Sequence, residues 1–362
     1  MKLMQSQKQT LDFTGEEVYA GIDAHLKSWR VSIMTNGIIC KTFSQNAKAE
    51  DLKTYLDRNY PNGTYYSAYE AGFCGFGPHR QLRELGISNI VVNPADVPTT
   101  DKDRKQKEDS RDSRKIVRSL YNRELEAIYV PDMEIEGLRS LVRYRRTLVK
   151  EISRYKSRTK SFLYYHNIEI PIELASGSTH WSKRYSDWLD SLDLGTIYSR
   201  ETLTHIKHTV EHLRAKLLEV NRKFRSIEKQ GEYSATIALL RTVPGIALIT
   251  AMTIITELDD IQRFKNIDGL CSYVGLVPRT NSSGDNDKTG GITPRSNRQL
   301  RSMLIESAWI AIRHDPALMM KYSELVKRMD PPKAIVNIAK KLLSRIKHVL
   351  VNKTPYVKGV VK

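Results

Sequence analysis

Cysteine is scarce in this sequence of 362 residues, with one at each of positions 40, 74 and 271. The three are far apart and form no Cys-x-x-Cys pair, which argues against a zinc ribbon or a disulfide framework and fits a reducing compartment. No apolar run approaches ~18 residues, so no membrane span is expected, and the N-terminal stretch MKLMQSQKQT lacks the core of a signal peptide. These absences predict a cytoplasmic protein without a membrane partner.

Acidic residues are also few relative to basic ones. The sequence has 41 Asp and Glu against 58 Lys and Arg, a formal net charge of +17. Clustered Lys and Arg gain affinity for nucleic acids by releasing condensed counterions from phosphates. The charge therefore favours a nucleic-acid partner, although a ribosomal or membrane-surface protein can show the same balance.

The first part of the chain, 1–130, alternates predicted strands and helices. The order is three strands, helix, strand, helix, strand, and the turn Asn36-Gly37 joins the second and third strands as a hairpin. A doubly wound nucleotide-binding fold would begin strand, helix, strand instead. The order predicts an α/β RNase H-like (RuvC-like) domain with strands at 18–23, 29–34, 38–43, 65–70 and 89–93 and helices at 49–59 and 79–85.

The rest of the chain is predicted to be mainly helical and falls into two regions. In 131–232, apolar residues at alternating spacings of three and four predict a long coiled-coil helix from Leu203 to Ile227, with a looser pattern from Leu138 to Phe162. These helices could pair with each other or with a second chain. In 233–362, shorter helices surround the turn VPGI, residues 243–246, which is typical of a helix-hairpin-helix, and an ordinary tight turn between two helices is the alternative.

Four carboxylates stand where an RNase H-type site needs them. Asp23 ends the first predicted strand and Glu70 the fourth, and these strands are neighbours in that fold. Asp109 and Asp112 are three apart on a probable helix, which puts their Cβ atoms roughly 5–6 Å apart on one face. Such a set holds two Mg²⁺ ions about 3.5–4 Å apart that polarise a phosphodiester. Asp101, Asp103 and Glu108 are near enough in sequence to be confused with these ligands.

The stretch PRTNSSGDNDKTGG, 278–291, is predicted to be a mobile loop that presents Ser282 and Ser283 among cations. A serine hydroxyl so placed could attack a phosphodiester and store the bond energy as a phosphoserine. The glycine turn around Gly245 could bind a backbone phosphate without reading sequence. The cations proposed to bind phosphate here are Arg279, Lys288, Arg295, Arg298 and Arg301.

A second basic segment, from Arg139 to His166, interleaves cations with tyrosines. That composition suits phosphate contact combined with base stacking, and a solvated helix face is the simpler alternative. The nucleic-acid contacts predicted from this segment are Arg143, Arg145, Arg146, Lys156 and Arg158.

In order and spacing, several of these motifs together resemble the insertion-sequence one-ten family of DEDD transposases, the bridge-RNA-guided recombinases of bacterial mobile elements. They are GIDAH, AYEAGFCG, the D-x-x-D of DSRD, VPGI, YVGLVPRTNSSG, GGITPRSNRQLR, KAIVNIAKKL and TPY, and they cover nearly the whole chain. The resemblance implies that Asp23, Glu70, Asp109 and Asp112 are the DEDD set. It also implies that Ser283, directly before Gly284, is the nucleophile of a serine transposase domain, although the neighbouring Ser282 could shift that assignment by one residue.

The resemblance further implies several partners. These are donor and target DNA, a structured guide RNA from the same element, and further copies of the chain in a homodimer or homotetramer, at the bacterial nucleoid. Two alternatives stay open on the sequence. One is a RuvC-like nuclease that uses metal-activated water without serine chemistry, and the other is a non-catalytic architectural protein that binds RNA or DNA.

Overall fold

The computed structural model describes residues 12–98, 109–175, 179–283, 286–292 and 296–359. The chain divides into two compact units, Met1–Val130 and Pro131–Lys362, and each has its own hydrophobic core. Within the described ranges, no helix has both the length and the apolar character needed to cross a bilayer.

The first unit is built on a five-stranded mixed sheet in the order β3-β2-β1-β4-β5. The hairpin strands pair antiparallel, whereas β1–β4 and β4–β5 pair parallel. This sequence of elements, and the adjacency of the first and fourth strands, confirm the prediction of a mixed α/β sheet domain compatible with an RNase H-like fold. The strands are β1 Glu17–Ala24, β2 Ser28–Thr35, β3 Ile38–Asn46, β4 Thr64–Glu70 and β5 Ser88–Val92, and the helices are α1 Ala49–Asn59, α2 Gly77–Glu84 and α4 Asp109–Tyr121.

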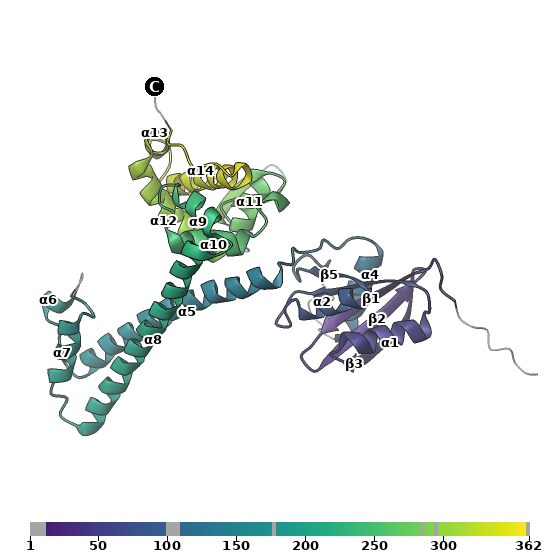
Figure 1. The fold of residues 1–362 in the computed structure, drawn as a ribbon, viewed down its shortest axis with the longest axis horizontal. Helices are drawn as coiled ribbons and strands as arrows, with labels where there is room; N and C mark the ends of the chain where they lie inside the picture. Colours follow the sequence, from purple (N-terminus) through teal and green to yellow (C-terminus); the bar gives the residue numbers. More distant parts are fainter. Residues whose placement is uncertain (1–11, 99–108, 176–178, 284–285, 293–295, 360–362) are drawn as a thin grey trace, which may run out of the picture. The chain divides into compact units, whose positions relative to one another are not determined.

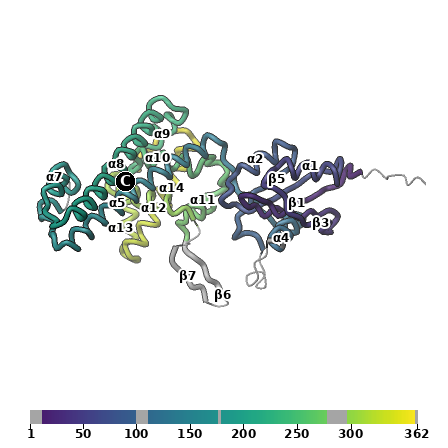
Figure 2. The backbone as a smooth tube through the Cα atoms, turned by 90° about the horizontal axis from the view of Figure 1, so that it is seen from below, coloured from purple at the N-terminus to yellow at the C-terminus, as the bar shows by residue number. Residues whose placement is uncertain are grey.

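Helices cover both faces of this sheet (Figure 2). Because successive strand residues point to opposite faces, β1 divides its side chains between two clusters. Val18 and Ile22 pack with Leu52 of α1 and Leu82 of α2 on one face, while Tyr19 packs with residues of α4 on the other. This alternation determines the face of the sheet to which each side chain of β1 and β4 points.

The second unit begins with a long helical pair, α5 Met133–Tyr165 and α8 Ile197–Gln230, which pack against each other within one chain. Each starts at a side-chain cap, Asp132 for α5 and Thr196 for α8, as expected for residues that satisfy unpaired N–H groups. Two short helices, α6 Ile172–Ala175 and α7 Lys183–Ser191, join them in a separate small core around Trp181. No pattern in the sequence indicates this small core, and the coiled-coil geometry itself stays a prediction.

The remainder of this unit is a helical bundle, visible in Figure 1 around α14. Ile338, Leu342 and Ile346 of α14 are fully buried in its core. The elements are α9 Ser234–Arg241, α10 Leu248–Leu258, the 3-10 turn η1 Ile261–Arg263, α11 Ile267–Val274, β6 Pro278–Ser283, β7 Asn286–Ile292, α12 Arg298–His314, α13 Pro316–Val326 and α14 Pro331–Asn352.

The serine-bearing stretch differs from the sequence prediction. The prediction of a loop over 278–291 was wrong, because β6 and β7 form an antiparallel two-stranded hairpin. Its polar, glycine-rich composition hid the strands, since the stretch lacks the alternating apolar residues by which strands are usually found.

The turn at Gly245 is a close-packed point of the bundle. Its φ of +84° lies in the left-handed region, and a Cβ there would come within 2.4 Å of the carbonyl oxygen of Ser307 on α12. Glycine is therefore required by backbone conformation and by helix packing. Phosphate binding by this turn, and the helix-hairpin-helix assignment, remain predictions.

Candidate functional site

Three of the four predicted carboxylates lie on one face and at one end of the sheet. Tyr19 of β1 and Tyr66 of β4 lie on the face of the sheet that α4 covers. Asp23 is four residues after Tyr19 and Glu70 is four residues after Tyr66, so both acids lie on that same face. The parallel register pairs Ile22 with Tyr69, so Asp23 and Glu70 are the next residues of both strands. The sheet thus brings these two acids to adjacent strand ends.

Helix α4 brings the aspartate pair to the same face. A Cβ on Gly21 would lie 2.3 Å from the carbonyl oxygen of Ser113 and 2.4 Å from the backbone nitrogen of Val117, so the helix backbone rests directly on β1. The Ser113 hydroxyl is also hydrogen-bonded to Ser32 of β2 at 2.9 Å, in the interior. Asp112 immediately precedes this contact and is half-buried. The N-terminal turn of α4 therefore lies close to the strand end that carries Asp23.

The side chains are not gathered around a common point in this structure. Asp23 Oδ2 is 3.2 Å from Nε2 of His25, an ion pair when that histidine is protonated. Among the residues with described side chains, no group of three or more His, Cys, Asp and Glu is close enough to hold a metal. Asp109 begins α4, but its side chain is outside the described part of the chain. The donors still fit a hard cation, because Mg²⁺ prefers carboxylate oxygens.

Two further polar residues adjoin this edge and were missed from the sequence. His25 contacts Asp23 directly. Arg30 of β2 is the register partner of Asp23 across the antiparallel pair, and its guanidinium donates to the Ser44 hydroxyl at 2.9 Å. The motif GIDAH contained the histidine, and the hairpin register, once known, identifies the arginine.

The hairpin of β6 and β7 carries both candidate serines at its tip. Ser282 pairs with Asp287 and Ser283 pairs with Asn286, which makes Ser283 the last residue of β6 before the turn. The two serines therefore occupy different register positions of the hairpin. The side chains of 278–292, including Arg279 and Lys288, are outside the described part, as is the whole of Arg295.

The base of this hairpin is fastened to the bundle by a buried carboxylate. Asn297, which caps α12, donates from its backbone nitrogen to the Tyr273 carbonyl at 3.1 Å and from its side chain to Glu257 at 2.8 Å. Tyr273 lies before β6 and Asn297 after β7, so both ends of the hairpin are held. Glu257, which is 1% exposed, also accepts two hydrogen bonds of 2.8 Å from Arg143 of α5.

Charge compensation keeps this buried acid ionised. Burial alone would raise the pKa of Glu257, but the hydrogen bonds and charge of Arg143, together with Asn297, hold it below its usual range. The same pairing raises the pKa of Arg143. Arg143, predicted to contact nucleic acid, therefore has a structural partner as well.

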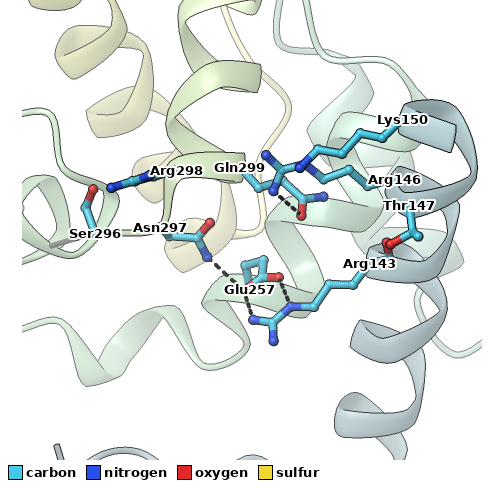
Figure 3. A pocket seen from close by; sticks show the side chains of 9 residues that line it. All are labelled: Arg143, Arg146, Thr147, Lys150, Glu257, Ser296, Asn297, Arg298 and Gln299. Carbon is cyan, nitrogen blue, oxygen red and sulfur yellow. Dashed lines mark hydrogen bonds and ion pairs between the residues drawn. The ribbon is translucent and has the colours of Figure 1, made fainter. Parts of the chain in front are cut away.

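A basic pocket of about 460 Å³ opens beside this anchor (Figure 3). Arg146 donates to Gln299 of α12 at 3.2 Å, which ties α5 to the start of α12. Three of the predicted nucleic-acid contacts, Arg143, Arg146 and Arg298, line the pocket. The full lining is Arg143, Arg146, Thr147, Lys150, Glu257, Ser296, Asn297, Arg298 and Gln299.

The other predicted cations have contacts of their own within the unit. Arg145 donates to Asn221 of α8, and Arg301 donates to the Ser296 hydroxyl and the Gly275 carbonyl. Lys156 lies 5.5 Å from the centre of the Trp181 ring and Arg158 lies 4.6 Å from that of Tyr155. Arg145 therefore also joins α5 to α8, whereas the contact of Arg158 lies within α5.

The sequence matches two transposase family models. One is the IS110-type DEDD transposase model, over residues 20–167, and the other is the transposase IS116/IS110/IS902 family, over residues 237–324. The first spans the sheet, α4 and most of α5, and the second spans the hairpin and its anchor. The chain belongs to the IS116/IS110/IS902 transposase family. This confirms the family expected from the motifs, and membership of a transposase family classes the protein as an enzyme.

Curated relatives agree with this assignment. The chain is 32% identical over 244 residues to the putative transposase y4qE of Sinorhizobium fredii, covering 67% of this chain and 58% of that protein. It is 27% identical to the putative transposase y4rJ of the same organism, over 90% of both chains. It is 24% identical to the transposase for insertion sequence element IS1533 of Leptospira borgpetersenii, over 81% of this chain and 85% of that one. A DEDD domain implies divalent-metal chemistry.

Proposed function

We propose that this family member is an RNA-guided DNA recombinase of an insertion sequence. In this account Asp23, Glu70, Asp109 and Asp112 hold two Mg²⁺ ions, and Ser283 is the nucleophile that attacks DNA. The observation that supports it most directly is the convergence of β1, β4 and the N-terminal turn of α4 at one end of the sheet. Asp23 and Glu70 stand at adjacent strand ends there, and Asp112 stands in the helix turn beside them.

The carboxylates have one task in this proposal. Acidic side chains grouped at one edge are mutually repulsive, and a divalent cation offsets that repulsion. Bound Mg²⁺ would stabilise negative charge on the oxygens of the phosphodiester. His25, which contacts Asp23, would restrict the orientation of that carboxylate, and Arg30 on the neighbouring strand would add positive charge near the phosphate.

The hydroxyl of Ser283 performs the covalent step. Its Oγ forms a bond to phosphorus while the bond from phosphorus to one strand's oxygen breaks. The serine gives up its proton, and the departing oxygen is released as a strand hydroxyl after protonation. Attack by a hydroxyl of another strand reverses the step, so strands are rejoined without ATP.

Guide RNA and self-assembly complete the proposal. On α5, Tyr144, Tyr164 and Tyr165 are 46%, 54% and 84% exposed among Lys and Arg residues. Exposed aromatic rings beside cations suit base stacking combined with phosphate contact. These surfaces support binding of a structured RNA, and the long helices α5 and α8 support a homodimer or homotetramer on donor and target DNA.

The decisive experiment is a search for a serine-linked DNA species. Full-length protein is incubated with end DNA of its element, the flanking transcript and Mg²⁺, then resolved on a denaturing gel. We expect a covalent adduct that maps to Ser283 and disappears in Ser283→Ala, while Ser282→Ala retains it. Normal cutting by Ser283→Ala would favour the metal-dependent RuvC-like nuclease. Unchanged activity of Asp23→Asn and Asp109→Asn would favour the architectural protein.

A further inference from the structure

The basic pocket at the base of the serine hairpin has a lining suited to one kind of ligand. All nine lining residues are polar or charged, with no aliphatic or aromatic side chain among them. Small-molecule sites of roughly 300–1,000 Å³ are usually lined mainly by apolar and aromatic groups. This pocket is of that size, but each of its lining residues carries a polar or charged group, so it suits a hydrophilic anion better than an apolar ligand.

Its electrostatics point the same way. The lining contains four cations, Arg143, Arg146, Lys150 and Arg298, and one carboxylate, which leaves three net positive charges. That carboxylate, Glu257, already accepts hydrogen bonds at both oxygens, from Arg143 and from Asn297. It is therefore committed to the anchor and does not oppose an incoming anion as an unpaired acid would.

The pocket is built before any ligand arrives. The bidentate pair with Glu257 uses Nε and Nη2 of Arg143 and so fixes the plane of its guanidinium, as Figure 3 shows. Arg146 is directed towards α12 by its bond to Gln299. A pre-oriented cation loses less side-chain entropy on binding than a free one. Lys150 and Arg298 add exposed cations to this fixed framework.

We infer that this pocket holds a phosphodiester of the DNA strand beside the serine hairpin, with Lys150 and Arg298 as its exposed contacts. The inference rests on the proposed function, since it takes DNA as the substrate of Ser283. Location supports that choice, because Ser296 is only four residues beyond the end of β7 and Asn297 bonds to Tyr273 on the other side of the hairpin. Glu257 is the positioning residue of this site and Lys150 is a binding residue that sequence reasoning missed.

The test compares two double variants that each remove one lysine and one arginine. Lys150→Gln with Arg298→Gln neutralises the pocket, and Lys223→Gln with Arg225→Gln neutralises exposed cations of α8 as the control. All four side chains are exposed, so the core is unaffected in both. Binding of the full-length chain to a fluorescein-labelled DNA duplex is measured by anisotropy over a series of salt concentrations, in chelator.

The pocket variant is expected to bind DNA about tenfold more weakly, as for loss of a charge-assisted bond to phosphate. Its slope of log K against log salt should be shallower by about 1 for each phosphate that the variant no longer neutralises. The control variant should bind DNA more tightly than the pocket variant and keep the steeper slope of log K against log salt. Equal affinity and slope in the two double variants would overturn the inference.

A labelled RNA duplex is run in parallel to separate the two sources of phosphate. Loss of RNA binding alone, with DNA binding equal to that of the control, would overturn the assignment to DNA. Because chelator removes metal and no bond is cut, the result does not depend on Ser283. A missing serine adduct would therefore refute the proposed function while leaving the pocket result standing. Equal DNA binding by the two double variants would overturn the pocket assignment while leaving the serine chemistry untouched.

Discussion

The contact between Gly21 and α4 allows a sharp test of how the acidic edge is assembled. Replacing Gly21 by alanine adds a Cβ that would lie 2.3 Å from the Ser113 carbonyl oxygen and 2.4 Å from the Val117 nitrogen. Ordinary contact needs at least 3.4 Å, so α4 must move from β1 by about 1 Å. Both opposing atoms belong to the helix backbone, so no side-chain rotation can relieve the overlap.

The expected cost follows from two opposing effects. Overpacking of a well-packed site costs about 1–3 kcal/mol. Alanine restricts the unfolded chain more than glycine does and returns about 0.5–1 kcal/mol, so we expect a net loss of about 1–2 kcal/mol. The larger effect is on activity, because α4 carries Asp109 and Asp112, and a displacement of about 1 Å at a reacting group can cost about 100-fold in rate.

Two measurements with a matched control check this reasoning. Hydrogen exchange of peptides from β1 and α4 reports local stability, and Mg²⁺-dependent DNA cleavage by the full chain reports the site. The control is Gly77→Ala in α2, where a Cβ would meet nothing within 4 Å, and it should leave both unchanged or slightly raise stability. If Gly21→Ala cleaved DNA and exchanged its amide hydrogens at the wild-type rates, the proposed role of the β1–α4 contact would be refuted.

Three further predictions concern the second unit. Gly245→Ala should destabilise the bundle by at least about 2 kcal/mol in urea unfolding, because it combines a φ of +84° with a 2.4 Å approach to Ser307; wild-type stability would contradict the packing. Burial raises the pKa of Asp315, but bonds from Tyr356 and its other partners outweigh burial and lower it. The stabilisation by ionised Asp315 should thus be present above the unfolded pKa of 3.8 and be lost as pH falls through the folded pKa. Asp315→Asn should therefore weaken the bundle near neutral pH and reduce the loss of stability at acid pH. An unchanged loss of stability at acid pH would refute this. Glu257→Gln should cost about 1–3 kcal/mol and speed hydrogen exchange at Tyr273 and Asn297, and unchanged exchange there would contradict the anchor.

The sheet was predictable because its signals are local. Asn36-Gly37 marks the hairpin, and apolar residues flanked by polar ones mark each strand, so the order of elements followed from the sequence. The small core around Trp181 was not predictable, because it depends on short helices that have too few turns for a clear period. The hairpin of β6 and β7 was missed for a related reason, since its sequence is polar and lacks the alternating apolar residues that mark a strand.

The candidate site was predictable in its residue types more than in its contacts. Asp23 and Glu70 follow from strand ends and Asp112 from helical spacing, whereas the support from Gly21 requires knowledge of how closely α4 approaches. The anchor of Glu257 is likewise invisible in sequence, because its partners Arg143 and Asn297 are 114 and 40 residues away. Long-range pairs of this kind depend on the tertiary fold and leave no local pattern.

Binding of Mn²⁺ to the full chain in the presence of a short DNA duplex, followed by electron paramagnetic resonance, tests the metal site most directly. The account predicts that the wild-type protein and Glu50→Gln, an exposed acid on α1 across the sheet, bind Mn²⁺ equally. It predicts that Asp23→Asn and Asp112→Asn lose most of that binding. Equal Mn²⁺ binding by all four proteins would contradict the claim that acids from β1, β4 and α4 form one metal site.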